Sequence, residues 1–173
     1  MSILKETNLH NKTKISQSIT ETVVKAAYSI NIEAVEEATL TKVIDLLRDG
    51  LGVLLAGISH NTVKILVEHF KPQEPKTGIK VIGHNLEANL PEAAFMYGCA
   101  IHSMDFEPMF LPPTHAISPV LSPLIAIAQS REIDGKTFLK AFMAGIQIEA
   151  GLRIGAKIAE DRKSTRLNSS HPS

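Results

Sequence analysis

The residues best suited to chemistry lie close together, between positions 100 and 115 of the chain. His102 and Asp105 are three residues apart at the end of an apolar run, so they share one face if that run is helical. A proline-rich stretch, residues 106–113, then leads to His115. Titratable groups beside an apolar helix are costly to bury unless they pair with another group or take part in catalysis or binding. We therefore expect a catalytic site here.

Each of these residues also has an ordinary structural interpretation. Asp105 can accept backbone N–H bonds in a loop, His102 can be a buried histidine bonded to a carbonyl, and His115 can simply precede a helix. The trio matches no standard spacing of metal ligands, so we expect no metal. Cys99 is expected to be a packing residue. Because it is the single cysteine, an intrachain disulfide is excluded.

Composition narrows the class of protein. The chain has 173 residues, 44% of them hydrophobic, with 18 basic and 18 acidic side chains. Zero net charge gives no general attraction to nucleic acid or an anionic membrane, and we expect neither partner. The apolar stretches 51–58 and 93–101 are too short to cross a bilayer, and the first residues do not resemble a signal peptide. We expect a cytoplasmic protein, with a mitochondrial location left open.

Hydrophobic periodicity predicts a mainly α, multi-helix fold. The prolines within 106–113 predict an irregular segment, and 79–82 is the only strand that the pattern favours. A cluster of glycines at positions 50, 52 and 57 indicates close helix–helix contact or a helix end. The predicted helices cover residues 15–30, 34–56, 61–70, 89–101, 118–128 and 137–157.

Three regions follow from these patterns. Residues 1–14 are polar and unpatterned, so we expect them to be disordered. Residues 15–161 form the helical domain. Residues 162–173 are a polar tail with three basic side chains, no acidic ones and only Leu167 as a bulky apolar group. This break in pattern predicts a non-native tail, with the native sequence ending near Asp161.

The segments LPEAAFMYG (90–98), AIHSMDFEP (100–108) and PPTHAISPVLSPLIAIAQS (112–130) resemble the MmgE/PrpD family. The resemblance extends over roughly residues 19–157 and implies the family's N-terminal all-helical domain, truncated and without the smaller α+β lid domain. It also implies a cofactor-free lyase, homodimeric in full-length form. Such a lyase removes a proton next to a carboxylate of a small di- or tricarboxylic acid, with loss of water or carbon dioxide.

The same resemblance implies roles for individual residues. Asp105 and His115 line the active site as catalytic residues: Asp105 positions or polarises a substrate group, and His115 serves in acid–base work or binds a carboxylate. His102 and Met109 fall at substrate-binding positions. Met109 stands where the dehydratases and decarboxylases usually have a polar residue, so the substrate wall is more apolar here. Further active-site histidine and lysine residues of the family lie beyond this chain, which predicts no turnover by the chain alone.

Two alternatives stay open. An epimerase or racemase of the same family would use the same proton abstraction without losing a group. A non-catalytic helical dimerisation module would instead use the apolar, glycine-rich faces of residues 50–57 and 145–155, which favour contact with a partner.

Overall fold

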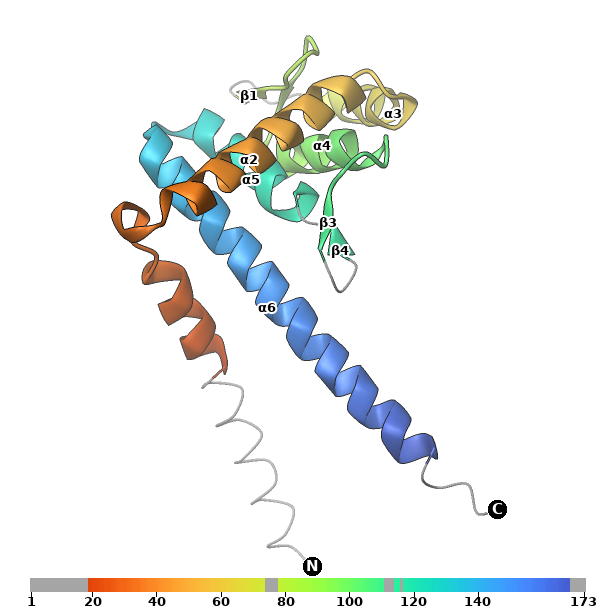
Figure 1. Cartoon of the computed structure of the whole chain (residues 1–173). Coiled ribbons are helices and arrows are strands. Elements are labelled where there is room, and N and C mark those ends of the chain that lie inside the picture. The colour runs from red at the N-terminus through yellow and green to blue at the C-terminus, as the bar shows by residue number, and fades with distance from the viewer. Residues whose placement is uncertain (1–18, 74–77, 111–113, 116, 169–173) are drawn as a thin grey trace, which may run out of the picture.

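The computed structural model describes residues 19–73, 78–110, 114–115 and 117–168. Helices dominate this part of the chain, which confirms the mainly α prediction (Figure 1). A helix over residues 19–28 is followed by η1 (Ile32–Ala34), α2 (Glu37–Gly57), α3 (Asn61–Phe70), η2 (Lys71–Gln73), α4 (Leu90–His102), α5 (Ser118–Ser130) and α6 (Gly135–Asn168).

Helix α4 lies at the centre of the core, between α2 and α5. Its N-terminus carries a capping box, in which the side chain of Glu92 accepts a hydrogen bond from the backbone N–H of Asn89 at 3.0 Å. Small and apolar side chains follow, which suits a helix that is covered on most sides. The largest fully buried side chains come from α2 to α6 and include Leu54, Met96, Tyr97, Ile101, Ile117, Leu121 and Phe142.

Two glycines of α2 let neighbouring helices approach closely, as the sequence predicted. A Cβ atom on Gly50 would stand 2.6 Å from a methyl carbon of Ile117, and a Cβ atom on Gly57 would overlap the carbonyl group of Ala100. This part of the expected interaction surface is therefore covered by the chain's own α4 and α5. Gly52, which has nothing within 4 Å of an added Cβ, faces open space.

Two short hairpins correct the prediction of a single strand. In the first, β1 (Ile79–Lys80) pairs antiparallel with β2 (Glu87–Ala88), so the strand predicted over 79–82 is only two residues long. In the second, β3 (Met109–Phe110) pairs antiparallel with β4 (Thr114–His115). The expectation that 106–113 is irregular was therefore wrong at Met109–Phe110. Pro108 precedes β3 instead of interrupting it, and proline is tolerated at such a position.

Helix α6 is far longer than predicted. It runs away from the body of the domain, with the helix over residues 19–28 beside it (Figure 1). At its start, Asp134 accepts hydrogen bonds from the Thr137 hydroxyl at 2.7 Å and from the Thr137 backbone N–H at 2.9 Å. The bond from the hydroxyl, followed by the bond from the backbone N–H, lowers the pKa of Asp134. The helix continues past Asp161 to Asn168, while the origin of the polar tail stays a prediction. The predicted disordered segment 1–14 lies outside the described residues.

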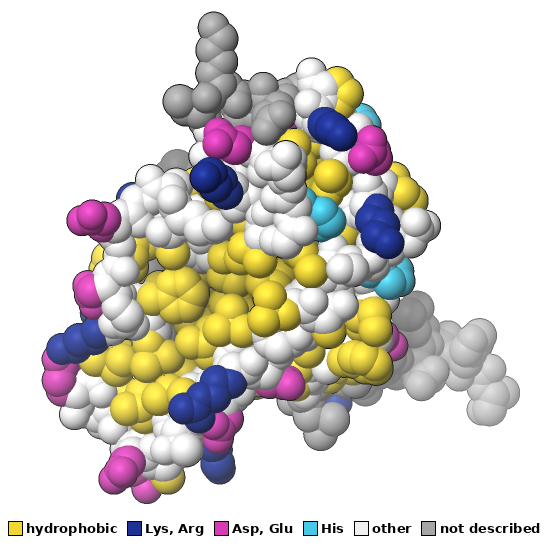
Figure 2. Space-filling view, turned by 90° about the horizontal axis from the view of Figure 1, so that it is seen from above, with side chains coloured by type: hydrophobic (Ala, Val, Ile, Leu, Met, Phe, Trp, Pro, Cys, Tyr) yellow, Lys and Arg dark blue, Asp and Glu magenta, His cyan; other side chains and the backbone are white. Residues whose placement is uncertain are grey.

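Hydrophobic side chains also gather on the surface. Figure 2 shows a broad apolar area on the face seen from above. In the described part of the chain no single helix is long and apolar enough to span a membrane. Among the described helices, only α2 and α3 taken together reach that length and apolar character, and they are bent by 73° to each other. Val53, Leu54 and Val63 of this pair are buried in the core.

Candidate active site

The end of α4 positions the first group of site residues. His102 is the last residue of the helix, and its imidazole is about half exposed. Three residues further on, the backbone N–H of Asp105 donates to the carbonyl oxygen of His102 at 3.0 Å. Asp105 has a φ of 54°, in the left-handed region that side chains other than Asn and Asp rarely adopt. This turn redirects the chain and leaves the Asp105 carboxylate exposed beside the helix end.

The β3–β4 hairpin brings His115 back to the same place. Met109 and His115 are opposite each other in the hairpin register. The rings of His102 and His115 meet edge to face, with centroids 4.3 Å apart and an interplanar angle of 89°. The structure therefore brings together His102 and His115, as the sequence predicted, and places Met109 at the neighbouring hairpin position with its side chain 56% exposed.

Glu107 is a site residue that the sequence analysis missed. Its side chain is fully buried. One carboxylate oxygen, Oε1, accepts hydrogen bonds from the backbone N–H groups of Ile117 at 2.6 Å and Ser118 at 2.5 Å. These groups open α5, whose own N-cap residue makes no side-chain bond. A carboxylate here also complements the positive end of the helix dipole. No local motif signals this role, because acceptor and donors are ten residues apart.

The second oxygen of Glu107 faces both histidines. Oε2 lies 3.4 Å from Nδ1 of His115 and 3.6 Å from Nδ1 of His102. Both Oε2 and the Nδ1 atom of His115 are buried without a hydrogen-bond partner. Buried polar atoms normally have partners, so two unpartnered atoms facing each other need a physical explanation. The three side chains offer ligand atoms that all lie within 4.8 Å of one another.

Glu149 on α6 adds a second carboxylate to this cluster. Burial raises the pKa of Glu149, and the nearby Glu107 carboxylate raises it further, while a hydrogen bond from the Thr114 hydroxyl and the charge of His115 act in the opposite direction. One of its carboxylate oxygens, Oε2, is buried without a partner. Glu149 thus links the long helix to the β4 strand that carries His115. No local sequence pattern singles out Glu149, because its partners come from a hairpin that is distant along the chain.

An open pocket of about 500 Å³ gives a ligand access to the cluster. It is lined by Thr62, Cys99, His102, Ser103, Asp105 and His115. Burial raises the pKa of the Cys99 thiol, which disfavours the nucleophilic thiolate. The pocket therefore offers two imidazoles and one exposed carboxylate, a set suited to proton transfer and to holding an anionic substrate.

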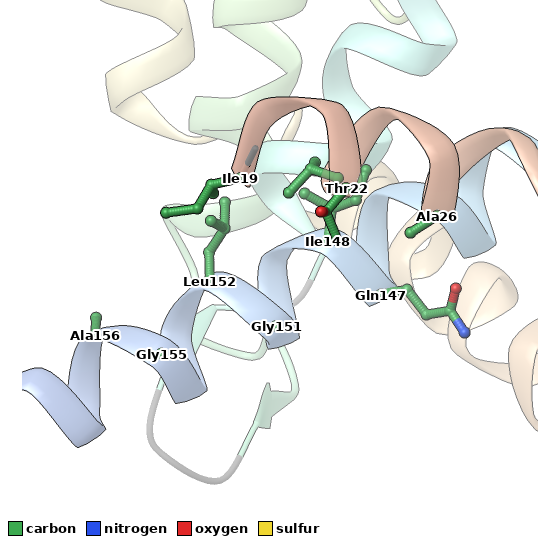
Figure 3. Close-up of a pocket in the computed structure, with 10 residues that line it drawn as sticks. Ile19, Thr22, Ala26, Gln147, Ile148, Gly151, Leu152, Gly155 and Ala156 are labelled. Carbon is green, nitrogen blue, oxygen red and sulfur yellow. The ribbon is translucent and has the colours of Figure 1, made fainter. Parts of the chain in front are cut away.

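A second, larger pocket of about 720 Å³ lies away from this chemistry, between the helix over residues 19–28 and α6 (Figure 3). Its lining is mostly apolar and contains no titratable side chain: Ile19, Thr22, Val23, Ala26, Gln147, Ile148, Gly151, Leu152, Gly155 and Ala156. Such a surface suits packing against another apolar segment, and we assign the catalytic candidate to the smaller pocket.

Comparisons with known proteins identify the family to which the chain belongs. Residues 21–170 match the family model described as the MmgE/PrpD N-terminal domain. The chain is 31% identical to human cis-aconitate decarboxylase over 151 residues and 29% identical to the mouse protein over the same length. In both cases the match covers 84% of this chain but only 31% of the relative.

Proposed function

We propose that this chain, which belongs to the MmgE/PrpD family, forms the N-terminal helical part of a lyase that acts on small di- or tricarboxylic acids. The observation that supports this proposal is the convergence of Asp105, His102 and His115 on one open pocket at the end of α4. The chain spans about a third of the length of the curated relatives it matches, so the remaining active-site groups would come from outside it.

The proposed reaction removes a proton from the carbon next to a carboxylate and expels water or carbon dioxide from a neighbouring carbon. Such a step needs an acid–base group of suitable pKa and donors that stabilise the charge developing on the carboxylate. In the proposal, Asp105 positions or polarises the reacting group. His115 transfers a proton or binds a carboxylate, and His102 and Met109 contact the substrate. The apolar Met109 then favours a substrate with a less polar substituent at that point.

Turnover by the gene product that contains this chain tests the proposal. The assay measures loss of water or carbon dioxide from cis-aconitate, citrate and 2-methylcitrate, together with deuterium uptake from solvent. We expect activity on at least one acid, abolished by Asp105→Asn, and no turnover by residues 1–173 alone. Deuterium uptake without group loss would favour the epimerase or racemase alternative. Absence of both group loss and deuterium uptake for every acid would refute proton abstraction.

A second candidate, a non-catalytic interaction module, is favoured by the apolar pocket between residues 19–28 and α6. Gly151 and Gly155 line this pocket and have nothing within 4 Å of an added Cβ. A homodimer in which a second copy covers this surface would be weakened by Leu152→Glu and unaffected by Asp105→Asn. Sedimentation measurements on the two variants separate this candidate from the lyase, since the catalytic variant should leave self-association unchanged.

A further inference from the structure

We propose that Glu107 is a positioning residue that fixes the same proton arrangement on His102 and His115, with hydrogen on Nδ1 of each ring and a bare Nε2. Oε2 of the carboxylate lies 3.4 Å from Nδ1 of His115 and 3.6 Å from Nδ1 of His102. In a neutral imidazole one nitrogen carries hydrogen, and the hydrogen-bond partners decide which one. The proposal deepens the proposed lyase function by making Nε2 of His115 the proton acceptor, and this catalytic part rests on that function.

The carboxylate of Glu107 is held in a fixed orientation and presents an acceptor to the two rings. Its side chain is fully buried, and Oε1 accepts hydrogen bonds from the backbone N–H groups of Ile117 and Ser118 at the N-terminus of α5. The positive end of the α5 dipole stabilises a negative charge at this point. An ionised carboxylate has lone pairs and no hydrogen, so Oε2 needs donors among the groups that it faces.

The Nδ1 atoms of the two histidines are the donors that face this oxygen. Oε2 of Glu107 and Nδ1 of His115 are both buried without a hydrogen-bond partner, which is costly for each atom. A bare Nδ1 would set its lone pair against the carboxylate, whereas hydrogen on Nδ1 gives both atoms a partner. The separation of 3.4 Å is slightly longer than an N–H···O bond of about 2.7–3.2 Å. Hydrogen bonds of catalytic groups often shorten only when substrate is bound.

Hydrogen on Nδ1 leaves the lone pair of each ring on Nε2. Because Nδ1 of His115 is buried while its ring lines the open pocket of about 500 Å³, Nε2 is the nitrogen that a ligand there can reach. In the proposed reaction, Nε2 forms a new N–H bond with the proton next to the substrate carboxylate, and the electron pair of the broken C–H bond stays on the substrate. Glu107 then stabilises the positive ring through a charge-assisted bond from Nδ1–H and takes no proton itself.

Nitrogen-15 nuclear magnetic resonance of the histidine rings in the labelled 173-residue chain tests the arrangement without turnover. Spectra are recorded while the pH is raised until the ring signals stop changing, where the rings are neutral. Bare and protonated ring nitrogens then differ widely in chemical shift, and we expect hydrogen on Nδ1 of His102 and His115. His84 is the internal reference, because its Nε2 lies 2.9 Å from the carbonyl oxygen of Ile58 and must carry hydrogen to donate to it.

Glu107→Gln should reverse the arrangement on both rings. The amide oxygen of glutamine can accept from the N-terminus of α5, which leaves its NH₂ group, a donor, facing the histidines. Nδ1 of His102 and His115 then becomes an acceptor, and hydrogen moves to Nε2. A merely structural role of Glu107 would not cause this exchange, and His84 should not change. Glu149→Gln is the matched control, because it removes the other nearby carboxylate and should leave all three rings as in the wild type.

In the complete gene product, Glu107→Gln should lower kcat by about a hundredfold or more while KM changes little, because an Nε2 that carries hydrogen cannot accept a proton. Hydrogen on Nε2 of His115 in the wild-type chain would overturn the proposal, and this spectrum decides the point should Glu107→Gln fail to fold. An arrangement that is unchanged in Glu107→Gln, or reversed in Glu149→Gln, would also overturn it. Reversed rings with an unchanged kcat would refute the catalytic role of Nε2. Rings arranged as proposed, without turnover of any acid, would refute the lyase function alone.

Discussion

Replacing Glu107 with alanine should destabilise the fold through the N-terminus of α5. The carboxylate accepts two backbone hydrogen bonds, from Ile117 at 2.6 Å and Ser118 at 2.5 Å. Hydrogen bonds to a charged group contribute about 1.5–3 kcal/mol each, which gives a gross loss of about 3–6 kcal/mol. Removal of a buried charge recovers part of its desolvation cost, so we expect a net loss of about 2–4 kcal/mol in the free energy of unfolding.

Urea unfolding followed by far-ultraviolet circular dichroism measures this loss. Glu107→Gln keeps an oxygen acceptor and should lose about half as much stability as Glu107→Ala. Glu132→Ala is the matched control, since Glu132 is exposed in the segment between α5 and α6, and its effect should stay within about 0.5 kcal/mol. If Glu107→Ala unfolds at the same urea concentration as Glu132→Ala, the carboxylate does not anchor α5 and the argument for a fixed Glu107 fails.

Three further experiments probe packing, backbone conformation and charge. Gly57→Ala should destabilise the chain by about 1–3 kcal/mol because the added Cβ overlaps the carbonyl group of Ala100. Gly52→Ala, at a position that faces open space, should stabilise the chain by about 0.5–1 kcal/mol. Equal urea midpoints for the two variants would contradict the close packing of α2 against α4 at Gly57. Asp105→Gly should fold at least as stably as the wild type, because glycine relieves the positive φ, yet bind carboxylic acids more weakly in an equilibrium titration; a large loss of stability would show a structural role. Burial raises the pKa of Glu149 above 4.5, so ionisation of this group opposes folding. Glu149→Gln should be as stable as the wild type below pH 4.5 and should become more stable than the wild type as the pH rises through the raised pKa. Urea titrations that show no such pH dependence would refute the shift.

The helices could be predicted from the sequence because their signals are local. The predicted helix 61–70 has the same bounds as α3, which ends directly before Lys71–Pro72, a local stop signal. The predicted start at 89 lies one residue before α4, where Asn89, Pro91 and Glu92 are local start signals. The far end of α6 was not predicted, because its composition becomes polar after Asp161 while the backbone remains helical to Asn168.

The site could be predicted only in part, because only some of its contacts are local in the sequence. His102 and Asp105 lie near each other along the chain, and the proline-rich stretch 106–113 leads directly to His115, so all three could be grouped from the sequence. Glu107 and Glu149 escaped notice because their roles depend on contacts with the N-terminus of α5 and with the β3–β4 hairpin. That hairpin has two-residue strands, which are too short to leave a periodic pattern.

The measurement that tests the central claim most directly is nuclear magnetic resonance of the labelled chain during titration with cis-aconitate. We expect the largest signal changes at Asp105, His102 and His115, and we expect them to disappear in His115→Ala while Leu152→Glu leaves them unchanged. Changes confined to the apolar pocket between residues 19–28 and α6, or changes that persist in His115→Ala, would contradict the claim that the end of α4 and the β3–β4 hairpin form the carboxylate site.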